Sequence, residues 1–388
     1  MRICDPLLPV LANEFDASLS AAAATTTGFA LAYGSTQLFF GPLGDRLGRL
    51  QVIVVAISIA AVASIASAVA PSLDLLIAAR VATGAFAAAA IPLSLGWIGD
   101  NVAFNERQPV LARYLIGQML GMTTGQIGGG VLADLVGWRF AFWSIALLFA
   151  GAAVMLHRSM RVPAGTAVDG GTGQVAPRAA STATAPSPPG IIGQARLLLA
   201  DRWAMIVIGT VTLEGIMLFG AVALIASYLQ RSFGTPPSIA GTVSALFGLG
   251  GIFYAVNARR LLARLQPSGL CRLGGVLFAL AMLVLIFQPA WQPAVAATLM
   301  AGLGYYMLHN TLQTQATQLS TEARGAAIAW FATGLWLGQG IGVSIAAAVA
   351  ERFGFLVVFG TTALGLVVLG TAFGRALDAR EIELRTGG

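Results

Sequence analysis

Apolar stretches of about 20 residues recur along the whole chain and limit its possible folds more than any other feature. An α-helix needs this length to cross about 30 Å of hydrocarbon. Of the 388 residues, 57% are hydrophobic and only 10% are charged, so we predict an all-α polytopic membrane protein. The expected spans cover residues 1–13 (part of a helix), 22–43, 51–70, 73–98, 109–134, 138–157, 203–228, 237–258, 269–288, 293–316, 325–349 and 354–374.

These spans form two sets of six on either side of a polar interval. We expect an N-terminal transmembrane half, a cytoplasmic linker, a C-terminal transmembrane half and a cytoplasmic tail, at residues 1–157, 158–202, 203–374 and 375–388. The stretch Val162–Gly190 is rich in Ala, Thr, Ser, Gly and Pro and has too few apolar residues to form a core, so the linker should be largely disordered. The first span is too short to cross a membrane. It is either a re-entrant segment or part of a truncated first helix, and we favour truncation.

The two halves also repeat each other weakly. Phe29–Arg49 aligns with Ser244–Arg264 at an offset of 215 residues, although the acidic residue is lost in the second copy. Internal repeats of this kind are typical of transporters that hold their substrate between two related halves, near the middle of the membrane.

Charge and cysteine content exclude several classes of protein. The net charge is +6, but all 22 basic residues are arginines scattered through short loops, which fits the positive-inside rule better than nucleic-acid binding. Placing Gly41–Arg49 inside leaves only Arg139, Arg231 and Arg352 outside. We therefore expect a multi-pass protein of the bacterial cytoplasmic (inner) membrane, with its linker and C-terminus in the cytoplasm. Two cysteines indicate neither a disulfide framework nor a metal site.

A short charged stretch, Gly41–Arg49, lies between the second and third spans. It closely resembles motif A, G-x-x-x-D-R-x-G-R, of the major facilitator superfamily. This resemblance implies a conformational latch in which Arg49 pairs with Asp100 and Asp45 faces the start of the eleventh span near Gly325. The expected latch residues are Gly41, Asp45, Arg46, Gly48, Arg49 and Asp100.

Two further stretches resemble motifs of the drug:proton antiporter branch, which includes multidrug and sugar-efflux-like transporters. The fifth span is similar to motif C, with Gln126 in place of its proline, and Arg80 with Thr83 and Gly84 resembles motif B. Small residues four apart also allow close helix packing. The packing glycines that we expect are Gly121, Gly125, Gly129 and Gly130.

Ionisable and polar residues inside the spans are the candidates for substrate binding and proton coupling, because charges there are costly without a function or a partner. The candidates fall on the first, fourth, seventh and tenth spans, and the resemblance to the superfamily implies that these four helices line a central cavity. The candidates are Asp5, Arg80, Glu214, His309, Asn310 and Gln313. Glu214 ranks first because its depth, near the middle of the seventh span, does not depend on how the first span is completed.

We therefore predict a monomeric secondary transporter that exports a drug-like molecule or metabolite by alternating access, in exchange for protons, without a cofactor. The alternative within the superfamily is a sugar or metabolite facilitator or symporter. A membrane enzyme would need a metal or nucleophile cluster, and a transport-like receptor would typically need an ordered soluble domain. The sequence indicates neither. A chain without lysine cannot form a Walker phosphate-binding loop, so this chain should not be driven directly by ATP.

Overall fold

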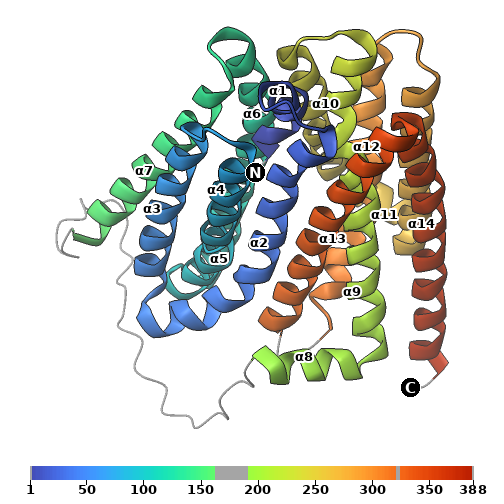
Figure 1. Cartoon of the computed structure of the whole chain (residues 1–388). Helices are drawn as coiled ribbons and strands as arrows, with labels where there is room; N and C mark the ends of the chain where they lie inside the picture. The colour runs from blue at the N-terminus through green and yellow to red at the C-terminus, as the bar shows by residue number, and fades with distance from the viewer. Residues whose placement is uncertain (1, 162–190, 320–323, 387–388) are drawn as a thin grey trace.

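The computed structural model describes residues 2–161, 191–319 and 324–386, and these residues form helices joined by short turns. Figure 1 shows two bundles side by side, with α8 crossing below the second bundle. The first bundle contains a 3₁₀ turn (Arg2–Leu7), α1 (Leu8–Glu14), α2 (Leu19–Leu47), α3 (Arg49–Ala68), α4 (Leu73–Ala87), α5 (Ala90–Asn101), α6 (Phe104–Leu135) and α7 (Trp138–Arg161).

The helix α8 (Ile191–Ala200) precedes the second bundle. That bundle contains α9 (Arg202–Glu214), a π-helical turn (Gly215–Phe219), α10 (Gly220–Phe233), α11 (Pro237–Phe287), α12 (Pro293–Ala316), α13 (Arg324–Phe353) and α14 (Phe355–Thr386). Among the residues that the structure describes, seven helical stretches are long and apolar enough to cross a membrane. The expected all-α polytopic fold is thus confirmed.

Prolines explain several departures from the expected spans. The fourth span is broken between α4 and α5, because Pro92 lacks the N–H that would bond to the carbonyl of Ala88. The first segment begins as a 3₁₀ turn that contains Pro6. The eighth and ninth spans join in α11 without a loop, at a sharp turn where Gln266, just before Pro267, adopts a φ of 57°.

Helices extend into both the expected linker and the expected tail. Residues 191–200, which we placed in a largely disordered linker, form α8, whose Leu198 is buried in a small apolar cluster with Ala204 and Ala327. Burial of Leu198 accounts for the helical structure of these residues. Residues 162–190 of the expected linker lie outside the described part of the chain. The helix α14 continues through the expected tail as far as Thr386.

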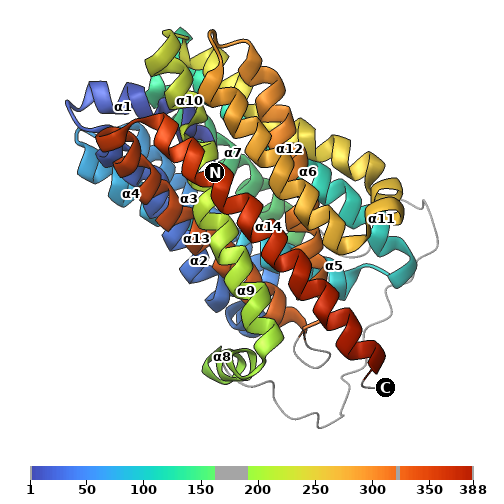
Figure 2. The same cartoon turned by 90° about the vertical axis from the view of Figure 1, so that its right-hand side faces the viewer.

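The halves contact each other mainly where α2 packs against α13 and α6 packs against α11. Figure 1 shows the helices of the two halves diverging toward the end of the molecule where α8 lies, and Figure 2, turned by 90°, shows α8 and the C-terminus at this same end. We call this end, which also holds Asp45 and Asp100, the open end, and the opposite end, with Ser20 and Glu351, the closed end. Toward the open end, the last hydrogen bond between described residues of the two halves joins Gln37 Nε2 to Thr333 Oγ1 at 3.0 Å.

Candidate functional site

A buried carboxylate and an imidazole form a pair in the middle of the second bundle. Glu214 ends α9 and is fully buried, and His309 on α12 is 12% exposed. The His309 Nδ1 lies 2.8 Å from the Glu214 Oε2. This is an ion pair when His309 is protonated. Glu214 lies within Arg202–Phe233, a helical stretch long and apolar enough to cross a membrane, where a carboxylate is a candidate for function.

The backbone and the aromatic residues nearby fix the position of this pair. The π-helical turn begins directly after Glu214, and such turns interrupt the regular helical hydrogen bonds and often occur at functional sites. The His309 ring stacks on Tyr305 with centroids 4.8 Å apart, and Phe331 lies 5.6 Å away on α13. These rings cover His309 with apolar surface and leave only a small part of it accessible.

A second buried ion pair lies in the first bundle, in the 3₁₀ turn. The Arg2 guanidinium donates to the Asp5 carboxylate at 2.7 Å, and the two side chains are 5% and 0% exposed. Gln126 on α6 donates to the same Asp5 oxygen at 3.4 Å. Gln126, which stands where motif C has proline, therefore contributes a polar contact to Asp5.

Aromatic rings connect these two pairs across the interface between the halves. The Arg2 guanidinium lies over the ring of Phe219, 4.7 Å from its centroid, and Phe219 contacts Tyr305 edge to face at 5.4 Å. Tyr305 in turn stacks on His309. A continuous row of cation–π and ring contacts thus joins the Arg2–Asp5 pair of the first half to the Glu214–His309 pair of the second.

Arg80 is separate from both pairs. It is 1% exposed on α4, and its guanidinium lies over Phe29 at 4.4 Å and Phe142 at 5.7 Å. Its Nε and Nη2 atoms are buried and have no hydrogen-bond partner among the described residues. The aromatic faces therefore provide the favourable contacts that the structure gives to this cation.

The two amides expected in the cavity lie on the same helix as His309, toward the open end. Asn310 is exposed and donates from Nδ2 to the Tyr254 hydroxyl of α11 at 3.2 Å. Gln313 is exposed on the next turn of α12. The candidate residues thus form two paired groups, a separate cation and an amide stripe, rather than one cluster.

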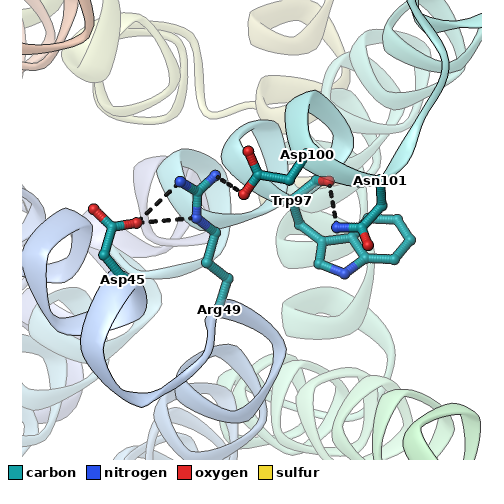
Figure 3. A network of polar contacts seen from close by, with 5 residues as sticks. All are labelled: Asp45, Arg49, Trp97, Asp100 and Asn101. Atoms are coloured by element: carbon teal, nitrogen blue, oxygen red, sulfur yellow. Dashed lines mark hydrogen bonds and ion pairs between the residues drawn. The ribbon is translucent and has the colours of Figure 1, made fainter. Parts of the chain in front are cut away.

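The motif A residues form a network at the open end (Figure 3). Arg49 donates to Asp45 at 2.9 Å and lies 3.2 Å from the Asp100 carboxylate on α5. Its guanidinium lies against Gly96, where an added Cβ would be only 2.0 Å from Nη1. Asp45 is therefore paired with Arg49, within its own half, and the expected contact of Asp45 near Gly325 lies outside what the structure describes.

The other motif A residues shape the turn between α2 and α3. Gly48 ends α2 with a φ of 89°, a conformation that favours glycine. Gly41 lies within α2 and Arg46 is exposed in its last turn. An added Cβ at Gly41 would meet nothing within 4 Å.

The four expected packing glycines of α6 divide into two pairs. A Cβ at Gly129 would lie 2.5 Å from the Ile3 carbonyl oxygen, and one at Gly130 would lie 2.2 Å from the Pro237 carbonyl oxygen. At Gly121 and Gly125 it would meet nothing within 4 Å, so these two do not pack against another helix here. Gly129 is four residues beyond Gly125 on the same stripe of α6, so this stripe is closely packed only toward the closed end of the helix.

Sequence reasoning missed the partners that complete these groups. Arg2, Gln126 and Phe219 were visible as residue types, but the contacts between them join segments that are far apart in the chain. Within the described ranges, no group of three or more His, Cys, Asp or Glu side chains is arranged to hold a metal ion.

Comparison with known proteins agrees with this architecture. The sequence model of the Major Facilitator Superfamily matches residues 2–320 and 207–386. The chain is 32% identical over 158 residues to the uncharacterized transporter YgaY of Escherichia coli (strain K12), a match that covers 40% of this chain and 39% of YgaY. It is 27% identical over 143 residues to the efflux pump radE of Floropilus chiversii, covering 37% of this chain and 27% of radE.

The fold is similar to that of a known structure over nearly its whole length. The crystal structure of the nucleoside transporter NupG superposes with a TM-score of 0.73 at 14% identity, covering 96% of this chain and 95% of NupG. The matched relatives and this neighbour are transporters rather than enzymes. The chain therefore belongs to the Major Facilitator Superfamily.

Proposed function

We propose that the protein is a secondary active transporter that exports a small drug-like molecule or metabolite in exchange for protons, by alternating access. The observation that carries this proposal is the Glu214–His309 pair, a carboxylate and an imidazole 2.8 Å apart in the middle of the second bundle. The name of the relative radE, an efflux pump, supports the direction of transport.

The pair offers a simple route to coupling. With one proton on His309, the ion pair with Glu214 is neutral overall. When that proton leaves, the site carries one negative charge, which favours a cationic substrate or another proton. Competition between the two ligands for one site, alternately accessible from each side, exchanges one for the other.

We further propose that the open end faces the cytoplasm and that the protein acts as a monomer in a bacterial inner membrane. The positive-inside rule supports this orientation, because Arg46, Arg49 and Arg196 all lie at the open end. The linker and C-terminus are then cytoplasmic. In this orientation the structure is open to the cytoplasm, and the inter-half contacts at the closed end hold this state. The Asp45–Arg49–Asp100 network lies within the first half here, and it becomes a latch for the outward-open state when Asp45 also contacts the start of α13.

Proton flux in reconstituted vesicles tests the proposed coupling. We expect wild-type protein to move ethidium, a cationic probe, against its gradient when a pH gradient is imposed, with matching proton movement. Glu214→Gln should abolish uphill transport and proton movement while retaining downhill exchange of neutral substrates. Glu14→Gln, which alters an exposed pair with Arg139, is the matched control and should behave as wild type.

Two outcomes would contradict this function. Uphill transport with a normal pH dependence in Glu214→Gln would exclude Glu214 as the coupling carboxylate and leave Asp5 and His309 as candidates. If a screen of labelled sugars instead gives uptake that is independent of a pH gradient, the protein is a facilitator of the same superfamily.

A further inference from the structure

Two carboxylates at the closed end each accept a hydrogen bond from the start of a helix in the other half. Asp134, near the end of α6, accepts from the backbone N–H of Ser238 in the first turn of α11 at 2.8 Å. Glu351, near the end of α13, accepts from the backbone N–H of Ser20 in the first turn of α2 at 3.4 Å. Each half therefore supplies one carboxylate and one helix N-terminus.

Both contacts are electrostatically favourable. The first N–H groups of a helix have no partner within it and carry a partial positive charge, so a carboxylate there satisfies a donor and complements the helix dipole. Ser18, Ser20 and Arg231 also lie close enough to interact with the Glu351 carboxylate. Glu351 thus faces one cation and several polar donors at the interface between the halves.

The two contacts are related by the internal repeat of the chain. Glu351 follows Asp134 by 217 residues and Ser238 follows Ser20 by 218, close to the offset of 215 that aligns the two halves. The same symmetry relates α6 to α13 and α2 to α11. One arrangement therefore occurs twice at the closed end, with the roles of the two halves exchanged.

Neither contact can persist if the closed end opens. Asp134 and Ser238 lie beside the close approach of Gly130 to the Pro237 carbonyl, where α6 and α11 meet. Separating the halves at this end moves each carboxylate away from its helix N-terminus into water.

We propose that Asp134 and Glu351 are gate residues, which position the two halves by holding the closed end shut and release it during alternating access. This proposal rests on the proposed transport function. Because both carboxylates are exposed, each contributes modestly, and we expect its removal to change the ratio of closed to open molecules about two- to fivefold. Two such changes acting together are sufficient to redistribute states of nearly equal free energy.

Distances between spin labels test the gate directly. Cysteines replacing Phe140 and Leu356, exposed residues at the starts of α7 and α14, report across the closed end, and a pair at Leu47 and Leu262 reports across the open end. The native Cys4 and Cys271 are both buried, and alanine replaces them in the labelled protein. Measurements use the full chain in lipid nanodiscs.

Asp134→Ala and Glu351→Ala should each lengthen the closed-end distance in a larger fraction of molecules, and the double variant should do so more strongly. The open-end distance should shorten in the same fraction. Asp134→Asn keeps an oxygen acceptor but loses the charge, so its effect should be intermediate. Glu14→Gln removes a carboxylate at the same end that pairs within its own half, and should change neither distance.

The proposal is overturned if the double variant, with a wild-type melting temperature, retains both wild-type distance distributions. If the double variant does not fold, the Asp134→Asn and Glu351→Gln variants supply the same comparison. Flux measurements on the same samples separate this proposal from the proposed function. A gate that opens in a protein without proton-coupled flux would contradict the function alone, whereas normal flux with unchanged distances would contradict the gate alone.

Discussion

The stability of the buried Asp5 carboxylate depends on its ion pair with Arg2. Both side chains are buried, so removing Arg2 leaves an unpaired carboxylate among apolar groups. We expect Arg2→Met to destabilise the protein by about 3–5 kcal/mol, whereas Arg2→Met with Asp5→Asn should recover most of that loss. Thermal unfolding in detergent, compared across the single and double variants, measures the coupling between the two residues.

The Arg139–Glu14 pair provides the matched control. Its N–O distance is 2.8 Å, but the two side chains are 43% and 40% exposed. Arg139→Met should therefore cost no more than about 1 kcal/mol. Equal losses for Arg2→Met and Arg139→Met would show that burial does not determine the strength of the Arg2–Asp5 pair.

For these single residues, the sequence identified the ionisable side chains that are costly to bury, but not the partners that they contact. Depth within an apolar span was sufficient to single out Glu214, and the residue types around His309 marked it as a candidate. Their contact could not be predicted, because 95 residues separate them and the π-helical turn after Glu214 has no clear signature. Gln126 was read as a missing proline, whereas its amide contacts Asp5.

Among the elements, the turn between α2 and α3 gives a clear test of backbone strain. Gly48 adopts a φ of 89°, which a residue with a Cβ disfavours, whereas Gly41 lies within α2 with open space around it. We expect Gly48→Ala to destabilise the protein by about 1–3 kcal/mol and to displace Arg49 from Asp100. Gly41→Ala should be neutral or stabilise by up to about 1 kcal/mol.

Thermal unfolding of the two glycine variants makes this comparison, and transport assays report on the displaced Arg49. Wild-type stability in Gly48→Ala would mean that the turn relaxes to another conformation without cost. Both glycines belong to motif A, so motif membership alone predicts equal losses of stability. Only the backbone geometry, with a φ of 89° at Gly48 and a helical position for Gly41, predicts different losses.

The positions of helices were predicted most reliably where they follow a long apolar run. They were predicted least reliably where a proline interrupts the helical hydrogen bonds or where packing stabilises a short helix. The run between residues 73 and 98 marked a single span, but the missing N–H of Pro92 divides it into two helices. The helix α8 was missed because we included residues 191–200 in a linker whose disorder was inferred from the composition of Val162–Gly190, whereas Leu198 of α8 packs with Ala204 and Ala327. Such contacts between distant segments are not visible in sequence periodicity.

At the scale of the whole molecule, closure of the closed end depends on how closely the backbones of α6 and α11 approach each other. A Cβ at Gly130 would lie 2.2 Å from the Pro237 carbonyl oxygen and 2.7 Å from its carbon, so the backbones must separate to accept it. Gly130→Ala should therefore disfavour the closed form by about 1–3 kcal/mol, the usual cost of overpacking. When this end is open the contact is absent, so the added methyl group does not destabilise the open form.

We therefore expect Gly130→Ala to lengthen the Phe140–Leu356 distance in most molecules and to slow transport, because the return to the closed state becomes unfavourable. Gly125→Ala, on the same helix but with nothing within 4 Å of the added Cβ, should leave distance and rate unchanged. The spin-label and flux measurements described for the gate provide both readouts. Wild-type distances in Gly130→Ala would show that α11 shifts locally to accept the methyl group, so that the approach of these two helices does not set the state of the closed end.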